Sequence, residues 1–256
     1  MTTNEMKNKN SKNIIYKTAR ISKYYQSNRV KWEQFYPSER IVFEKLNPKS
    51  NVRVLDIGCG CGGLGLALAE KFSISDYTGV EINEQAVRAG QSLNPNARLL
   101  CTDILHSYLP DELSQPFDLV VSLSCIDWNI EFNNMLNRAW KLVKAGGYFV
   151  SSFRLTHQSG VADINRSYQF INFEEQREGE KAPYVVCNAS ELLGELRSFN
   201  PNKIYGYGYW GKPSKTAVTP FEQVCFCVIA LYKGEFPEIS PSVTLEFPPE
   251  IIKSLN

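Results

Sequence analysis

The sequence predicts an α/β fold in which a mostly parallel, doubly wound sheet is covered by helices on both faces. Between residues 52 and 155, short apolar runs alternate with helical patterns, and this alternation is typical of repeated strand–helix–strand units. The first apolar run ends in a glycine-rich turn that opens a helix. After residue 201, two long strand-like runs are separated only by a loop, which favours an antiparallel pair at the end of the sheet.

The region before this alternation divides into a polar tail, 1–13, and a helical cap, 14–48. Residues 1–31 carry eight Lys or Arg and one Glu. Such a basic arm could contact nucleic acid, but its richness in Asn and Lys favours a solvated tail. The cap has a helical pattern that Pro37 interrupts, and a second short helix is expected from Ser38 as its N-cap.

The alternating part contains five strand-like runs, each short and apolar enough for a strand that is buried on both faces. The expected strands are residues 52–58, 76–82, 97–103, 117–124 and 148–155. The helices expected between them are residues 63–72, 84–93 and 131–144. In the last of these helices the apolar residues share one face, and Gly146 lies where a helix commonly ends.

The remainder of the chain follows a different pattern. Residues 156–186 are polar and irregular, and a helix is expected from Ser190 to Phe199. The antiparallel pair is expected at 202–210 and 224–233. The last segment, 235–256, contains four prolines and is expected to be extended.

The glycine-rich turn lies in "VLDIGCGCGGLG", between a strand end and a helix start. Gly58, Gly60 and Gly63 satisfy the G-x-G-x-x-G pattern, which alone is a weak indicator of a dinucleotide site. Glycines at such a junction let a ligand approach the backbone, and the helix N-terminus offers unpaired N–H groups. The turn therefore predicts a ligand site whose chemistry is set by its neighbours.

Three carboxylates accompany this turn at the ends of successive expected strands. Asp56 precedes Gly58 by two residues, Glu81 follows Gly60 by 21 residues, and Asp103 ends the third strand. A carboxylate at the position of Glu81 can accept hydrogen bonds from both ribose hydroxyls. Three acids at one sheet edge would repel a pyrophosphate, so they favour a ligand with a ribose, an adenine amine and a cationic centre.

With these residues in place, the chain resembles the class I S-adenosylmethionine-dependent methyltransferases. The matching stretches, in the family's order, are "VLDIGCGCG", "GVEIN", "CTDIL", "FDLVVS" and "LVKAGGYFVSS". The resemblance implies a seven-stranded sheet with an antiparallel last strand and a helical N-terminal lid. It also implies a methyltransferase domain at 49–234, in which 156–186 is an insertion that forms a roof over the substrate.

The resemblance further implies S-adenosylmethionine as the cofactor, with S-adenosylhomocysteine as the product. The residues expected to bind it are Asp56, Gly58, Cys59, Gly60 and Gly62 at the methionine portion, Glu81 and Ile82 at the ribose, Asp103 and Ile104 at the adenine, Ser122 on the fourth strand, and Tyr25 in the lid. The alternative for the acids is that Asp56 and Asp103 cap local turns. The alternative for the lid is that its aromatic residues pack against the sheet.

A metal site is not expected, although Cys59 and Cys61 are closely spaced. A zinc site needs about four ligands and usually a second Cys or His pair. The two histidines of the chain, His106 and His157, stand at unlinked positions, and no C-x-x-C motif accompanies them. We therefore interpret the cysteines as small side chains of the turn.

Methyl transfer from a sulfonium is an in-line displacement that needs a positioned nucleophile and exclusion of water. A hydroxyl or amine nucleophile can also need a general base. The candidates are Asp127, beyond the fourth strand, and His157, directly after the fifth, because ligands bind at the carboxyl ends of such strands. The alternatives are that Asp127 caps the following helix and that His157 is a solvated loop residue.

The acceptor is predicted only by class. The fourth strand runs into Ser-Leu-Ser-Cys instead of the Asn/Asp-Pro-Pro-Tyr of family members that methylate nucleobases or glutamine, which disfavours a DNA substrate. We expect an oxygen or nitrogen of a small molecule or glycan. Two alternatives remain: an RNA or protein methyltransferase that uses the basic arm, and a catalytically silent protein that binds S-adenosylmethionine.

The compartment is predicted from composition. The first residues lack the apolar stretch of a secretory signal, and no run of about 18 apolar residues could span a membrane. The seven cysteines are therefore read as reduced thiols of a cytoplasmic protein. The sequence does not indicate an oligomeric state.

Overall fold

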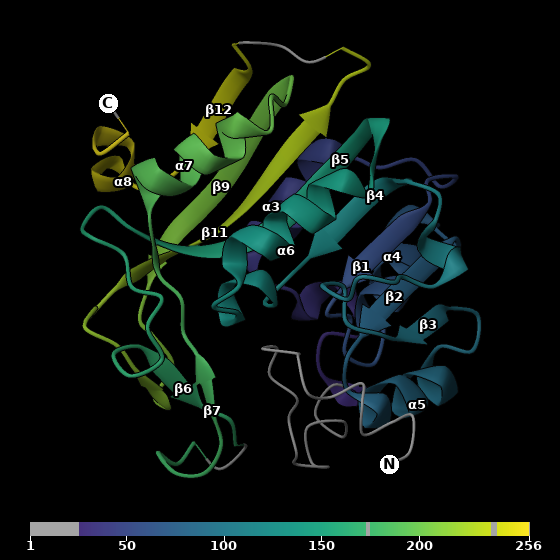
Figure 1. Cartoon of the computed structure of the whole chain (residues 1–256), viewed down its shortest axis with the longest axis horizontal. Helices are drawn as coiled ribbons and strands as arrows, with labels where there is room; N and C mark the ends of the chain where they lie inside the picture. Colours follow the sequence, from purple (N-terminus) through teal and green to yellow (C-terminus); the bar gives the residue numbers. More distant parts are fainter. Residues whose placement is uncertain (1–25, 173–174, 237–239, 256) are drawn as a thin grey trace.

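The computed structural model describes residues 26–172, 175–236 and 240–255. A large mixed sheet forms its centre (Figure 1). Its strands, in spatial order, are β12 (Ser242–Glu246), β9 (Lys203–Gly211), β11 (Val224–Lys233), β5 (Val143–Thr156), β4 (Phe117–Ser122), β1 (Val54–Ile57), β2 (Tyr77–Glu81) and β3 (Arg98–Cys101). The short β8 (Cys187–Asn188) pairs with the end of β5.

The strand directions confirm the doubly wound fold. The strands from β3 to β5 pair parallel to one another, whereas β11 is antiparallel to both β5 and β9. The order reverses at β1, which lies between β2 and β4. In open α/β sheets a ligand crevice forms outside the carboxyl ends of the strands at such a reversal.

Helices cover both faces of the sheet (Figure 1). Those of the central region are α3 (Pro37–Leu46), α4 (Gly63–Phe72), α5 (Glu84–Leu93), α6 (Phe132–Lys141) and α7 (Ala189–Ser198). Three short 3₁₀ helices are η1 (Trp32–Gln34), η2 (Asp111–Leu113) and η3 (Ile126–Trp128). No helix within the described part of the chain is long and apolar enough to cross a bilayer.

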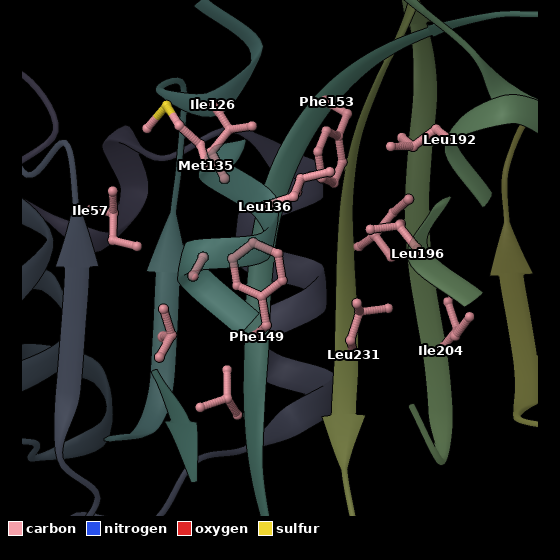
Figure 2. Close-up of a cluster of buried hydrophobic side chains, with 14 of the residues drawn as sticks. Ile57, Ile126, Met135, Leu136, Phe149, Phe153, Leu192, Leu196, Ile204 and Leu231 are labelled. Atoms are coloured by element: carbon pink, nitrogen blue, oxygen red, sulfur yellow. The ribbon is translucent and has the colours of Figure 1, made fainter. Parts of the chain in front are cut away.

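Alternation along the strands divides the core into two clusters. Phe149 and Phe153 of β5 point to the face covered by α6 and α7, whereas Val150 points to the face covered by α3 and α4. Figure 2 shows the first cluster, in which Leu136 of α6 lies against Phe149 and Leu196 of α7 lies near β11 and β9. The buried strand runs thus predict both layers correctly, because successive side chains alternate between faces.

The C-terminal segment differs from the expectation of an extended tail. Residues 242–246 form β12, which pairs parallel with β9 and extends the sheet beyond the seven expected strands. Pro249–Lys253 form a further helix, α8, and its Ile251 is fully buried in the core. The prolines mark the ends of these elements, because Pro249 fits the first turn of a helix.

The N-terminal cap also differs from the expected pattern. Residues 1–25, which include Tyr25 and the polar tail, lie outside the described residues. The helical pattern does not continue through Arg29, whose positive φ of 63° belongs to a turn. The second helix begins at Pro37 with Tyr36 as its N-cap, two residues earlier than Ser38 as N-cap would place it.

A second, small sheet forms from two segments that are distant in the sequence. Its strands are β6 (Tyr168–Phe170), β7 (Lys181–Pro183) and β10 (Ala217–Val218). Gln169 of β6 pairs with Ala182 on one side and with Ala217 on the other, both antiparallel. The insertion at 156–186, expected as irregular, therefore joins the loop between β9 and β11 in one structure (Figure 1).

Candidate functional site

A cavity of about 500 Å³ lies at the carboxyl ends of β1, β2, β3 and β4. Its lining includes residues of the glycine-rich turn, of the loops that follow β2, β3 and β4, of the segment around Arg29, and of the small sheet. This volume is typical of small-molecule sites in proteins. The reversal in strand order lies at the same position, as expected for this class of sheet.

The glycine-rich turn owes its path to backbone conformations that disfavour side chains. Gly58, Gly60 and Gly62 have φ values of 76°, 56° and 73°. A Cβ at Gly58 would also overlap with the Sγ of Cys125. A Cβ at Gly63, in the first turn of α4, would overlap with the backbone carbonyl of Arg29. The sequence pattern therefore reflects both positive φ angles and close approach of neighbouring segments.

Asp56 lies on β1 with only 4% of its surface exposed, and it lines the cavity. The hydroxyl of Tyr77 donates a hydrogen bond of 2.6 Å to its Oδ2. Burial raises the pKa of the Asp56 carboxyl to about 7, although the Tyr77 hydrogen bond and the charge of Arg29 act in the opposite direction. This carboxyl therefore changes its charge near neutral pH, and a cation bound beside it would favour the ionised form.

Glu81 ends β2 and holds the turn against the second strand. Its Oε2 accepts a hydrogen bond of 3.0 Å from the Gly60 N–H, and its Oε1 accepts one of 2.9 Å from the Asn83 N–H. Burial raises the pKa of Glu81, and these backbone donors oppose the rise. Each oxygen can accept a further hydrogen bond, so the fixed carboxylate is suited to two hydroxyls of one ligand.

Asp103 and Ile104 follow β3 and line the same cavity. The Asp103 Oδ1 accepts a hydrogen bond of 2.9 Å from the Leu105 N–H, so this residue also caps the local turn. Ile104 is buried and contributes an apolar surface. The two interpretations of Asp103, turn cap and cavity residue, thus apply together.

Most of the expected cofactor residues line one cavity, but two described residues do not. Those that line it are Asp56, Gly58, Cys59, Gly60, Glu81, Ile82, Asp103 and Ile104. Gly62 is instead the N-cap of α4. Ser122 is fully buried, 3.4 Å from the Ile57 carbonyl oxygen, and the loop after β4 reaches the cavity through Leu123, Ser124 and Cys125.

Asp127, the first candidate for a general base, points away from the cavity. Its Oδ2 lies 3.0 Å from Nη2 of Arg154, and both side chains are at most 5% exposed. Burial raises the pKa of Asp127 and the charge of Arg154 opposes this. Asp127 is not a cap of the following helix either, because α6 has Glu131 as its N-cap. The sequence alone could not reveal this ion pair, because Arg154 is 27 residues from Asp127 along the chain.

His157, the second candidate, is exposed and does not line the cavity. Its ring makes an edge contact with Trp210, with 6.2 Å between the ring centroids. This position agrees with the alternative of a solvated loop residue. Neither candidate base is therefore placed where it could reach a ligand in the cavity.

Among the cavity residues that the sequence did not predict are Arg29, Trp128 and Asn129. Arg29 lines the cavity and makes two hydrogen bonds with Glu39, of 2.8 and 3.1 Å, and its guanidinium lies 4.5 Å from the Phe35 ring centroid. Trp128 and Asn129 line the cavity directly after Asp127. The signal available in the sequence was a Trp-Asn pair that begins four residues after the end of the strand expected at 117–124.

The described residues contain no group of three or more His, Cys, Asp or Glu side chains arranged to hold a metal ion. Cys59 and Cys61 are both buried free thiols. Burial raises the pKa of Cys61 to about 11 and that of Cys59 well above its usual value, so both stay protonated at neutral pH. Protonated thiols are poor metal ligands.

Comparisons with known proteins agree with this geometry. A family model described as a methyltransferase domain matches residues 55–149, from β1 into β5. The chain is 26% identical over 151 residues to malonyl-(acyl-carrier protein) O-methyltransferase of Acetivibrio thermocellus, which covers 58% of this chain and 51% of that protein. It is 31% identical over 236 residues to the biotin biosynthesis bifunctional protein BioCD of Bordetella avium, which covers 73% of this chain and 50% of that protein.

The chain thus spans about half the length of these curated relatives. Among solved structures, it resembles a SAM-dependent methyltransferase of Methanosarcina mazei with a TM-score of 0.56 and 18% identity, over 78% of this chain and 99% of that chain. At this identity the likeness concerns the fold. The matched domain, the strand order and the acids around the glycine-rich turn lead to one conclusion. Residues 55–149 form a methyltransferase domain, and the chain has the Rossmann-like fold of S-adenosylmethionine-dependent methyltransferases.

Proposed function

We propose that this protein transfers a methyl group from S-adenosylmethionine to an oxygen or nitrogen of a small molecule or glycan. The observation that carries the proposal is the meeting of Asp56, Glu81 and Asp103 around one cavity beside the glycine-rich turn. Three carboxylates from adjacent strand ends match a ligand that combines hydroxyl, amine and cationic groups.

The residues of the cavity fit this cofactor. Glu81, fixed by two backbone donors, would accept hydrogen bonds from the ribose hydroxyls, and Asp103 would accept one from the adenine amine. Ile82 and Ile104 would provide apolar surfaces for the adenine ring. Asp56 would face the cationic methionine portion, and the bare backbone around Gly58 leaves room for close approach.

Arg29 adds a cation to a cavity that is otherwise rich in carboxylates. Its two bonds to Glu39 hold the guanidinium in place, so its charge stays at the cavity wall. There it would balance a carboxylate of the cofactor, and it already lowers the pKa of Asp56. Arg29 therefore belongs to the proposed cofactor site, together with the expected residues.

The cofactor, when bound, supplies a methyl group on a positively charged sulfur. The chain would orient the acceptor and exclude water, since an in-line displacement depends on these two contributions. The small sheet contributes Gln169 and Phe170 to the cavity, which the turn after β4 also lines. We do not propose Asp127 or His157 as the base, because neither lines the cavity.

The acceptor class is supported by the cavity and by a relative. A volume of about 500 Å³ suits a cofactor with a small acceptor more than a folded macromolecule. The Acetivibrio thermocellus relative is named as an O-methyltransferase, which supports oxygen as an acceptor atom within the family. The basic arm that would favour RNA or protein lies mostly outside the described residues.

Calorimetric titration with S-adenosylhomocysteine tests the cofactor site. The wild-type protein is expected to bind it, and Glu81→Gln to bind at least about tenfold more weakly, because hydrogen bonds to a charged group contribute about 1.5–3 kcal/mol each. Glu84→Gln is the matched control, since Glu84 is 67% exposed and its ion pair among the described residues is with Arg88. Equal affinities of Glu81→Gln and wild type, or binding of NADH in preference to S-adenosylhomocysteine, would refute the site.

The acceptor class is tested by release of S-adenosylhomocysteine from S-adenosylmethionine. The protein is incubated with a pool of small hydroxylated and amino compounds, with bulk RNA, or with unfolded protein. Turnover is expected with the small-molecule pool. Turnover that requires RNA or protein would establish the alternative acceptor, and tight cofactor binding without turnover on any pool would establish a silent binding protein.

A further inference from the structure

The loop after β4 brings two side chains of unlike chemistry to the same wall of the cavity. Trp128 ends η3 and Asn129 is its C-cap, and both line the cavity. Asp127, between Ile126 and Trp128, points the other way into a buried ion pair with Arg154. The loop is thus anchored in the protein through Asp127 and lines the cavity through Trp128 and Asn129.

The orientation of the Asn129 amide is fixed by its own backbone turn. Its Oδ1 accepts a hydrogen bond of 2.8 Å from the Glu131 N–H. A backbone N–H can only donate, so the oxygen must occupy this position and the NH₂ group must lie on the other side. Asn129 is 6% exposed, and among the described residues its NH₂ group has no hydrogen-bond partner. A donor that has no protein partner and belongs to a residue of the cavity lining favours a ligand with an acceptor atom.

Trp128 is held in one orientation by charged and aromatic neighbours. The Arg154 guanidinium lies 4.5 Å from its ring centroid, and Tyr184 contacts it edge-on with 6.0 Å between the centroids. Arg154 is itself fixed by Asp127 and by a hydrogen bond of 3.3 Å to the Val185 carbonyl oxygen. The part of the ring that these contacts leave uncovered lines the cavity, so it is a rigid surface for a flat group.

A second wall of the cavity is formed by the small sheet. Gln169 and Phe170 of β6 line the cavity, and the side-chain amide of Gln169 has no partner among the described residues. Gln169 is held by backbone pairing on both of its sides, with Ala182 and with Ala217. The two walls together offer aromatic surface and uncharged hydrogen-bonding groups.

We propose that Trp128 and Asn129 bind the methyl acceptor, and that this acceptor is a planar, conjugated ring with a neutral oxygen beside the methylated atom. Trp128 stacks on the ring, and the Asn129 NH₂ group donates a hydrogen bond to the oxygen. This inference rests on the proposed methyltransferase function. It selects, among small molecules, flat uncharged compounds over open-chain carboxylates, because Trp128, Asn129, Gln169 and Phe170 are neutral and Glu175, which also lines the cavity, would repel a carboxylate.

Salicylamide is a suitable probe, since it is planar and carries a hydroxyl next to a neutral carboxamide. It is titrated into the full-length protein that is saturated with S-adenosylhomocysteine, with trans-aconitate, an open-chain polycarboxylate, as the comparison. Saturable binding of salicylamide, at least about tenfold tighter than that of trans-aconitate, is expected. Absence of salicylamide binding, or equal or tighter binding of trans-aconitate, would overturn the proposed acceptor class.

Asn129→Asp tests the role of the donor directly. Aspartate keeps the oxygen that accepts from the Glu131 N–H but replaces the NH₂ group by a second acceptor, so salicylamide affinity should fall about tenfold. Asn133→Asp makes the same change on an exposed position of α6 and should leave the affinity unchanged. Trp128→Leu should also weaken salicylamide binding, through the loss of the flat surface.

Affinity for S-adenosylhomocysteine is measured for every variant and distinguishes the two levels of the proposal. Failure of the wild type to bind S-adenosylhomocysteine would remove the proposed function itself. Normal cofactor binding together with unchanged salicylamide affinity in Asn129→Asp would leave the methyltransferase function intact and overturn only this inference.

Discussion

The charge of Asp56 makes a quantitative prediction for the pH dependence of cofactor binding. In the free protein, burial raises the pKa of this carboxyl to about 7, so it is mostly neutral in mildly acidic solution. A ligand with a cationic amino-acid portion prefers the ionised form and must displace a proton to obtain it. Affinity for S-adenosylhomocysteine should therefore increase as the pH rises from 5.5 to 7.5.

The magnitude follows from the ionised fraction. With a pKa of about 7, about one Asp56 in thirty is ionised at pH 5.5 and about three in four at pH 7.5. If the bound form requires the carboxylate, the dissociation constant should fall about twentyfold over this range, equivalent to about 1.8 kcal/mol. Glu81 acts in the same direction, because burial also raises its pKa.

Calorimetry at the two pH values provides the measurement. At pH 5.5, titrations in two buffers with different ionisation heats should show that the protein releases close to one proton to the buffer for each ligand bound. Asp56→Asn should bind more weakly at pH 7.5, with a much flatter pH profile. Tyr77→Phe should move the midpoint to higher pH, because the Tyr77 hydroxyl stabilises the carboxylate. Affinity that is constant or tighter at pH 5.5 would refute the assignment of Asp56 to the cationic portion.

Three further predictions concern stability. Because the pKa of Asp56 is raised on folding, the ligand-free protein loses stability as the pH rises from about 4 through 7. Asp56→Asn should therefore raise the melting temperature at pH 8 but not at pH 4. An equal change in melting temperature at both pH values would contradict this. Arg154→Leu leaves the carboxylate of Asp127 buried without a counter-charge. The free energy of unfolding, measured by urea titration, should fall by about 3–5 kcal/mol. A loss below about 1 kcal/mol would mean that the ion pair is not formed. Gly58→Ala should lower the free energy of unfolding by roughly 1–3 kcal/mol more than Gly146→Ala. Both positions have a positive φ, but only at Gly58 would the new Cβ overlap with a neighbouring side chain. Equal losses would show that this overlap does not affect stability.

The parts of the site that were predicted from the sequence are those that the sheet topology determines. Parallel strands bring their carboxyl ends to one edge, so Asp56, Glu81 and Asp103 could be placed together from their positions at strand ends. The glycine-rich turn was equally readable, because positive φ angles select glycine. Periodicity alone also identified the strands and helices of both layers.

The parts that were not predicted depend on contacts between distant segments. Asp127 resembled a base because it follows a strand end, but its partner Arg154 was visible only once β4 and β5 were adjacent. Ser122 was placed at the cavity by analogy, whereas its side chain is buried at the end of β4 and the residues that follow it line the cavity instead. Arg29 gave no local signal, since its role depends on a turn with positive φ and on Glu39.

The C-terminal segment shows a different source of error. Its prolines suggested an extended chain, but prolines exclude regular structure only at particular positions. Pro249 occupies the first turn of α8, where no intrahelical N–H is needed, and β12 lies between the prolines. The proline content of the whole segment therefore obscured the alternating apolar pattern of β12, in which Val243 and Leu245 pack against the core.

The small sheet over the cavity has a consequence for how specificity could be exchanged between homologous enzymes. Its central strand β6 comes from the segment after β5, while β10 comes from the loop between β9 and β11. Lys215, next to β10, is also bonded to Glu175 of the first segment, with 2.6 Å between Nζ and Oε2. Transplanting either segment alone would mismatch the strand pairing between β6 and β10 and the ion pair between Lys215 and Glu175. The two insertions form one structural unit, and chimaeras of this protein should carry both insertions from the same parent.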